Sequence, residues 1–124
     1  MTGTLISFGH GYTARALGRR PAPAGWSVLG TGRNAATAQA LAAERAEPIL
    51  LGPDGLAGAG VTAALARADH VLVSIAPDSA GDPVLAAAVE ALATAAPHLS
   101  WIGYLSTTAV YGDHAGGWVD ETTP

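Results

Sequence analysis

The sequence predicts an α/β domain built on a parallel sheet with helices on both faces, and three observations lead to this fold class. Short apolar runs alternate with alanine-rich segments of helical length along the chain. The connections between these runs are too long for hairpins, so the strands should run parallel. The runs hold few polar residues, as strands covered on both faces do. Right-handed crossovers then give a doubly wound sheet of five strands in the order 3-2-1-4-5.

Local signals place each element in turn. The expected strands cover residues 4–8, 26–30, 48–51, 70–75 and 101–105. The expected helices cover residues 12–19, 35–45, 61–68 and 83–96. Glycine and proline mark turns at 21–25, 31–33 and 52–55, and residues 106–124 should form a loop. Ala14 and Leu17 should face inward from the first helix. Asn34 and Asp82 can cap the second and fourth helices, and Pro83 suits a first helical position.

The composition limits the classes of function. The chain has 124 residues, 49% of them apolar, which fits a single domain over 1–124. No apolar run could span a membrane and no leader is visible, so we expect no membrane role. The 6 basic residues are scattered arginines and the net charge is −4, which argues against nucleic acid as a partner. The chain has no cysteine, and its 4 histidines lack metal-ligand spacing, so we expect a cytoplasmic protein without a metal.

A glycine turn follows the first apolar run. Gly9, Gly11 and Ala14 form the pattern G-x-G-x-x-A directly after the expected strand 4–8. Gly9 permits the tight turn, Gly11 lets the main chain approach a diphosphate, and Ala14 lets the helix pack against the strand. The N–H groups of the first helical turn would face the phosphates. The expected cofactor contacts here are Gly9, His10, Gly11, Tyr12 and Thr13, with the main chain of His10 mattering more than its ring. The alternative is an ordinary strand-to-helix turn in a glycine-rich chain.

The strand order should reverse between the strands at 4–8 and 70–75, and ligands of such sheets lie over the strand ends at this point. The segment that leaves the strand at 70–75 should therefore lie beside the ribose and nicotinamide of a bound dinucleotide. Its residues are Ser74, Ile75, Ala76 and Pro77. The alternative is a simple strand exit that contains a proline.

Arg33 lies just past the expected strand 26–30, where chains that bind NAD usually carry a carboxylate for the ribose hydroxyls. A guanidinium suits a 2′-phosphate instead, because its hydrogen bonds to phosphate are charge-assisted. We therefore expect a Rossmann-type unit that prefers NADP, with NAD as a second cofactor. The alternative is a solvated loop arginine.

A second distinctive stretch is Leu105–Asp113, which reads L-S-T-T-A-V-Y-G-D, and W-V-D-E-T-T-P follows at 118–124. Together with the glycine turn and Arg33, these motifs resemble those of extended short-chain dehydrogenase/reductases, the NAD-dependent epimerase/dehydratase family. They are most similar to an atypical subgroup of NAD(P)-dependent epimerases. The resemblance covers the whole chain. Its two motifs follow the first and fifth expected strands, where the ligand crevice should lie. The resemblance also implies an acidic residue at the end of the run 48–51 that meets the adenine; Leu51 and Gly52 stand there instead, and Asp54 could substitute only if its loop folds back.

The resemblance implies that Thr107 matches the residue that hydrogen-bonds a substrate oxygen in such enzymes; the alternative is a hydroxyl that caps the backbone. It also implies a catalytic tyrosine helped by a following lysine. Tyr12, Tyr104 and Tyr111 lack that partner, because the chain has no lysine. The half that would bind a nucleotide sugar or another carbonyl compound is also missing after Pro124. We therefore expect the cofactor-binding half of an oxidoreductase or epimerase, truncated before its C-terminal substrate domain and inactive by itself.

Two other functions stay open at this point. The unit could bind or sense NADP without catalysing a reaction. A methyltransferase also has a glycine-rich first turn, but it needs an acidic residue where Arg33 stands. We also expect a homodimer, because the apolar strand at 101–105 would leave a bare edge on the sheet.

Overall fold

The strands and helices follow the order that the sequence predicts. The computed structural model describes residues 2–20 and 24–124, so most of the predicted turn at 21–25 lies outside the described residues. The strands are β1 (Thr4–Phe8), β2 (Ser27–Gly32), β3 (Glu47–Leu50), β4 (His70–Val73) and β5 (Trp101–Tyr104). The helices are α1 (Tyr12–Gly18), α2 (Ala35–Ala43), α3 (Ala59–Ala66) and α4 (Pro83–Ala95). Two short 3₁₀ helices are η2 (Gly55–Ala57) and η3 (Thr108–Tyr111).

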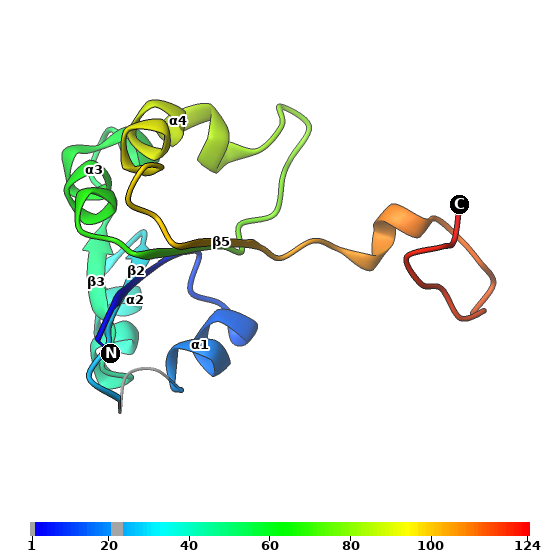
Figure 1. Cartoon of the computed structure of the whole chain (residues 1–124), viewed down its shortest axis with the longest axis horizontal. Helices are drawn as coiled ribbons and strands as arrows, with labels where there is room; N and C mark the ends of the chain where they lie inside the picture. The colour runs from blue at the N-terminus through cyan, green and yellow to red at the C-terminus, as the bar shows by residue number, and fades with distance from the viewer. Residues whose placement is uncertain (1, 21–23) are drawn as a thin grey trace.

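The five strands form one parallel sheet in the order β3-β2-β1-β4-β5, so the predicted fold class is confirmed. β1 is the central strand: its Ile6 pairs with Leu29 of β2 on one side and with Val71 of β4 on the other. Figure 1 shows α3 and α4 on one face of the sheet and α1 on the other. The order reverses between β1 and β4, whose last residues, Phe8 and Val73, are paired. This junction is where doubly wound sheets bind their ligands.

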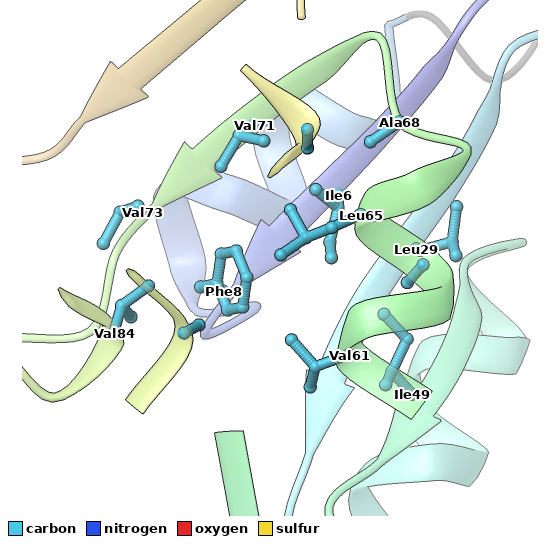
Figure 2. Packing of buried hydrophobic residues seen from close by; sticks show 13 residues of the cluster. Ile6, Phe8, Leu29, Ile49, Val61, Leu65, Ala68, Val71, Val73 and Val84 are labelled. Atoms are coloured by element: carbon cyan, nitrogen blue, oxygen red, sulfur yellow. The ribbon is translucent and has the colours of Figure 1, made fainter. Parts of the chain in front are cut away.

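Both faces of the sheet bury apolar side chains against helices, because successive residues of a strand point to opposite faces. Ile6 and Phe8 of β1 are completely buried in the larger cluster, between the sheet and helices α3 and α4, as Figure 2 shows. Other members of this cluster include Leu29, Ile49, Val61, Leu65, Val71, Val73 and Val84. The opposite face holds two smaller clusters: Leu5, Ala14 and Leu72 under α1, and Val28, Leu41 and Ala46 under α2. The buried ring of Phe8 thus anchors β1 directly before the glycine turn.

Polar side chains begin α2 and α4 where the sequence predicts. Oδ1 of Asn34 accepts a hydrogen bond from the N–H of Thr37 at 2.9 Å. Oδ1 of Asp82 accepts from the N–H groups of Val84 and Leu85 at 2.8 and 2.9 Å. Such caps satisfy N–H groups that have no partner inside the helix. Both capped helices follow the carboxyl ends of strands, so the caps fix the chain close to the ligand-binding edge of the sheet.

The inward face of α1 differs from the prediction at one residue. Ala14 is buried as expected, but Leu17 is 38% exposed and Gly18 is buried in its place. Residues four apart share one helix face, so Gly18 lies with Ala14 against the sheet, where it approaches Val28. Leu17 instead lines a hollow together with Leu5 and Trp26. The two small residues allow α1 to lie close to the strands.

The end of β2 also differs from the prediction, which places a loop at 31–33. β2 continues through Thr31 and Gly32 because these residues pair with Ile49 and Leu50 of β3. Thr31 is only 6% exposed. The strand therefore carries Thr31 into the ligand-binding edge, beside the glycine turn.

The chain after β5 leaves the sheet. Figure 1 shows residues 105–124, coloured orange to red, running away from the sheet with η3 as a short turn. The side chains of Val110 and Trp118 in this segment are exposed. β5 is also an edge strand, and its Ile102 and Tyr104 are 57% and 48% exposed. β5 and the segment 105–124 that follows it therefore both expose apolar side chains.

Candidate functional site

Two adjoining hollows lie over the carboxyl ends of the strands where the sheet order reverses. The Arg33 hollow has a volume of about 520 Å³ and the Thr107 hollow about 380 Å³. Gly11 and Ser74 line both, so the hollows form one crevice. The predicted residues Gly9, His10, Gly11, Arg33, Ser74 and Ile75 line the Arg33 hollow. Gly11, Tyr12, Thr13, Ser74, Ala76, Pro77 and Thr107 line the Thr107 hollow. The fold thus gathers every predicted site residue in one place.

Gly9 makes the turn out of β1 with φ +73°, a conformation that favours glycine. A Cβ on Gly9 would lie 2.7 Å from Cγ1 of Ile75, so no side chain fits there. The N–H of Gly9 donates to Oγ1 of Thr31 at 2.9 Å, and its carbonyl oxygen accepts from Oγ of Ser74. Oγ of Ser74 also lies 3.0 Å from the carbonyl oxygen of Phe8. The turn is therefore held by the ends of both strands that flank β1.

Gly11 leaves the main chain bare where it borders the crevice. A Cβ on Gly11 would meet no heavy atom within 4 Å, so a side chain there would project into open space. Gly11 is the N-cap of α1, and no described side chain caps this helix. Because α1 has only 7 residues, its dipole should contribute less than its unpaired N–H groups. The described residues therefore fit a diphosphate, since they offer N–H donors and room for close approach.

The ring of His10 packs against α1 and β2, while the expectation that its main chain matters more for the cofactor stays a prediction. A Cβ on Gly18 of α1 would lie 3.3 Å from Cε1 of His10, and one on Gly30 of β2 would lie 3.2 Å from its Cβ. Burial lowers the pKa of His10 from its ordinary value of 6.5; Glu44 raises this pKa and Arg15 lowers it further. The ring fits because α1 and β2 both carry glycine where they approach it.

Arg33 follows β2, and its exposed side chain borders the hollow named after it. Along residues 2–20 and 24–124, no carboxylate forms an ion pair with Arg33. Leu51 and Leu56 line the same hollow, whereas Asp54 does not and stands instead at the start of η2. The Arg33 hollow thus combines an apolar wall with a cation and no carboxylate, which suits a flat ring that carries a phosphate.

Thr107 begins η3 at the mouth of the other hollow. Its Oγ1 accepts a hydrogen bond from the N–H of Ala109 at 3.2 Å, so the hydroxyl does cap the backbone. This bond uses a lone pair of the oxygen and leaves the hydroxyl proton available to a ligand oxygen. Capping and substrate contact are therefore compatible at Thr107.

Tyr104 lies between the crevice and α4, and sequence reasoning gives it no role. Its hydroxyl donates to Oδ2 of Asp82 at 2.5 Å. This bond lowers the pKa of Asp82 and raises the pKa of Tyr104. The Tyr104 hydroxyl is therefore engaged in tying β5 to the start of α4 and holds its proton strongly.

Thr31 is a site residue that sequence reasoning places in a loop without a function. It lines the Arg33 hollow, and its hydroxyl oxygen accepts a hydrogen bond from the N–H of Gly9. The available signal is a threonine in an otherwise apolar strand whose end lies beside a glycine turn. That signal becomes meaningful only once β1 and β2 are known to be neighbours.

In residues 2–20 and 24–124, no group of three or more His, Cys, Asp or Glu side chains could hold a metal ion. None of the helices in this described part is long and apolar enough to cross a membrane.

No protein-family model and no curated protein matches the chain. A conserved protein of unknown function from Silicibacter pomeroyi is 54% identical, with a TM-score of 0.83 over 98% of this chain and 41% of that protein. A candidate epimerase from Burkholderia cenocepacia J2315 is 25% identical, with a TM-score of 0.60 over 98% of this chain and 43% of that protein. A variant short-chain dehydrogenase/reductase from Serratia marcescens is 18% identical, with a TM-score of 0.58 over 92% of this chain and 58% of that protein.

The structural neighbours therefore include short-chain dehydrogenase/reductase and NAD-dependent epimerase/dehydratase proteins, and the likeness covers most of this chain. At 18% identity such a likeness is one of fold. The chain spans 41% of the length of the Silicibacter protein, to which it is 54% identical.

Proposed function

We propose that residues 1–124 form a unit that binds a nicotinamide dinucleotide and prefers NADP to NAD. The observation that carries this proposal is the Arg33 hollow. There the main chain of Gly11 is bare at the point where the sheet order reverses, and Arg33 has no carboxylate partner among the described residues. Structural neighbours that are dehydrogenases and candidate epimerases support the same class of cofactor.

Each part of the dinucleotide has a place in this proposal. Gly9 would make the turn, the main-chain N–H groups of residues 10–13 would hold the diphosphate, and Arg33 would bind the 2′-phosphate. The adenine would lie against Leu51 and Leu56, which line the same hollow. The nicotinamide end would extend past residues 74–77 into the Thr107 hollow, because those residues connect the two hollows.

We propose Thr107 as the catalytic residue that this chain contributes. When bound, the nicotinamide ring gives or takes a hydride. The hydroxyl proton of Thr107 would donate to the oxygen of the carbon that is oxidised or reduced, and so stabilise negative charge on it. The substrate would be a nucleotide sugar or another carbonyl compound. Because the chain spans 41% of the Silicibacter protein, the substrate and activity of a longer protein belong to this proposal.

A second candidate function is an NADP-binding module without catalysis. Two observations favour it. The chain has no lysine to assist a catalytic tyrosine. Tyr104, which lines the Thr107 hollow, donates its hydroxyl proton to Asp82. Reduction of any member of a panel of carbonyl compounds by the chain in the presence of NADPH, which supplies the hydride, would exclude this candidate.

Calorimetric titration and thermal unfolding with NADP, NAD and S-adenosylmethionine test the main proposal. A ligand that binds only the folded chain raises the melting temperature, so NADP should raise it more than NAD at equal concentration. S-adenosylmethionine should have no effect. If neither dinucleotide binds, the proposed function is wrong, and binding of S-adenosylmethionine alone would point to a methyltransferase.

A pair of glycine variants shows whether binding occurs in the crevice. Gly11→Val places a side chain in open space within the crevice, and Gly52→Val does the same outside it, since neither Cβ meets an atom within 4 Å. Neither glycine has a positive φ, so both variants should fold. We expect Gly11→Val to lose NADP binding and Gly52→Val to keep it. Equal affinity in the two variants would place the dinucleotide elsewhere.

We also propose that two copies of the chain associate. The support for this is β5, an edge strand whose apolar side chains are exposed. Exposed apolar edges favour pairing with another strand. The cytoplasmic location expected from the composition stays a prediction.

A further inference from the structure

We propose that Thr31 and Ser74 are positioning residues whose hydroxyl groups hold the Gly9 main chain in the orientation that receives a diphosphate. The two side chains come from the ends of β2 and β4, the strands on either side of β1. The hydroxyl oxygen of Thr31 accepts a hydrogen bond from the N–H of Gly9, and the hydroxyl of Ser74 donates one to the carbonyl oxygen of Gly9. This inference rests on the proposed function and assigns a role that neither the glycine motif nor Arg33 supplies.

Thr31 fixes the N–H side of the turn. Its Oγ1 lies 2.9 Å from the nitrogen of Gly9, and the residue is 6% exposed. The backbone of Thr31 is fixed in the sheet, where the residue is paired with Ile49 of β3. A partly buried N–H that loses its acceptor is left without a hydrogen-bond partner in the protein, so the hydroxyl holds the turn in place.

Ser74 fixes the carbonyl side of the same residue. Its Oγ contacts the carbonyl oxygen of Gly9 and lies 3.0 Å from that of Phe8, while its N–H donates to the carbonyl of Phe8 at 2.9 Å. Oγ of Ser7, which is completely buried, lies 3.4 Å from the Gly9 carbonyl oxygen. The carbonyl oxygen of Gly9 is therefore contacted by two hydroxyl groups, one from Ser7 of β1 and one from Ser74, which directly follows β4.

This arrangement matters for anion binding because a peptide unit has two opposite ends. The planar trans peptide between Gly9 and His10 points its C=O and N–H in opposite directions. A glycine at φ +73° has few steric restraints of its own, so a rotation of this peptide could turn the carbonyl oxygen toward an incoming diphosphate and repel it. Hydroxyl groups that are hydrogen-bonded to the Gly9 carbonyl oxygen oppose this rotation of the peptide before the ligand binds. The free energy of ordering the turn is then supplied by folding and does not weaken binding.

The whole chain of 124 residues serves as the test protein, and four variants separate the hydroxyl role from simple packing. Thr31→Val keeps the shape and removes the acceptor, Thr31→Ser keeps the hydroxyl, and Ser74→Ala removes the donor. Thr94→Val is the matched control, since its hydroxyl donates to the carbonyl of Glu90 on α4, outside the crevice. Affinity for NADP and for NAD is measured by calorimetry, and the Gly9 amide is followed by hydrogen exchange without ligand.

We expect Thr31→Val and Ser74→Ala each to bind both dinucleotides about tenfold more weakly, since each loses one partly buried hydrogen bond at the turn. Thr31→Ser and Thr94→Val should bind like the wild type. Exchange of the Gly9 amide should be slow in the wild type and in Thr31→Ser, and faster in Thr31→Val. Because the diphosphate is common to both dinucleotides, the loss of affinity in these variants should be equal for NADP and NAD. Loss of Arg33 should instead weaken the binding of NADP and change that of NAD little.

Three results would overturn the inference. The first is wild-type affinity in folded Thr31→Val and Ser74→Ala, which would leave the proposed function standing. The second is a loss in Thr31→Ser as large as in Thr31→Val, which would mean that packing and not the hydroxyl matters. The third is a Gly9 amide that exchanges in the wild type as fast as an unprotected one, a result that also decides the matter if Thr31→Val does not fold. A wild type that binds neither dinucleotide would remove the proposed function and this inference together.

Discussion

Arg33 is an exposed residue that borders a hollow of the crevice, and no described carboxylate neutralises its charge. If it binds a 2′-phosphate, Arg33→Ala should weaken NADP binding by about 1–3 kcal/mol, the usual range for a lost hydrogen bond to a charged group. NAD lacks this phosphate, so its affinity should change little. Calorimetric titration of both dinucleotides measures the difference.

Arg20→Ala is the matched control for this prediction. Arg20 is also exposed, and it borders a different hollow, beside Trp26 and Trp101 at the amino ends of the strands. The variant therefore removes the same charge without touching the crevice. An Arg33→Ala chain that loses NADP and NAD affinity equally would exclude recognition of the 2′-phosphate.

His10 predicts a pH dependence of stability. Burial lowers its pKa below the ordinary value of 6.5, so the folded chain binds its proton less readily than the unfolded chain does. The stability that neutral His10 contributes is therefore complete above pH 6.5 and is lost as the pH falls through the lower pKa of the folded state. Melting temperatures between about pH 5 and about pH 8 should decline on the acid side, and His10→Asn should reduce that decline. An identical decline in the variant would assign the effect to other groups.

The residues of the candidate site differ in how far the sequence could predict them. The glycine pattern places Gly9 and Gly11 at the ligand-binding edge because their spacing after a strand has a local cause. The bond between Gly9 and Thr31 joins two strands that only the folded sheet brings together, and the sequence predicts a loop at Thr31. The packing of the His10 ring likewise depends on Gly30, a residue of the neighbouring strand.

At the scale of elements, β5 is tied to α4 through Tyr104 and Asp82. Their bond lowers the pKa of Asp82 below its ordinary value of 3.8 and raises that of Tyr104 above 10.0. Stability from the lowered carboxyl pKa is present above about pH 4 and is lost as the pH falls further. Stability from the raised phenol pKa is present below pH 10 and is lost as the pH rises through the higher value.

Tyr104→Phe should therefore lower the melting temperature at neutral pH, and its difference from the wild type should shrink at both pH extremes. Tyr12→Phe is the control, because the Tyr12 side chain is 92% exposed and its hydroxyl has no recorded partner among the described residues. Thermal unfolding of the three chains from about pH 3 to about pH 11 measures the differences. A Tyr104→Phe difference that does not vary with pH would mean that lost packing, and not the bond to Asp82, is responsible.

The order and type of the elements could be predicted because each has a local cause. Apolar runs specify the strands, Asn34 and Asp82 cap helices, and the long connections require a parallel sheet. The ends of elements depend on neighbours that the sequence does not reveal. β2 extends through Gly32 because β3 offers hydrogen-bond partners there. Ala14 and Gly18 fill the contact between α1 and the sheet, and Leu17 instead lines a hollow together with Leu5 and Trp26.

At the scale of the whole molecule, the sheet is covered unevenly. Strands of parallel sheets are normally covered on both faces, but β5 exposes Ile102 and Tyr104, and no strand of the described residues pairs with its outer edge. Leu85 and Val89 of α4 line a hollow together with these two residues and are 55% and 52% exposed. The unpaired backbone groups of β5 and this apolar surface lie side by side. A second copy of the chain could pair with β5 and cover both at once.

We therefore predict a concentration-dependent dimer of the 12.3 kDa chain, which sedimentation velocity and light scattering would detect as a doubled mass. Ile102→Lys should convert the dimer to a monomer, because a charge on the apolar surface of β5 opposes burial there. Leu50→Lys on β3 is a matched control: Leu50 and Ile102 are each 57% exposed, but they lie on opposite edge strands of the sheet. Association through β5 requires the dimer to survive Leu50→Lys and not Ile102→Lys. A wild type that stays monomeric at high concentration, or a dimer that Leu50→Lys disrupts instead, would show that β5 is not the surface that pairs.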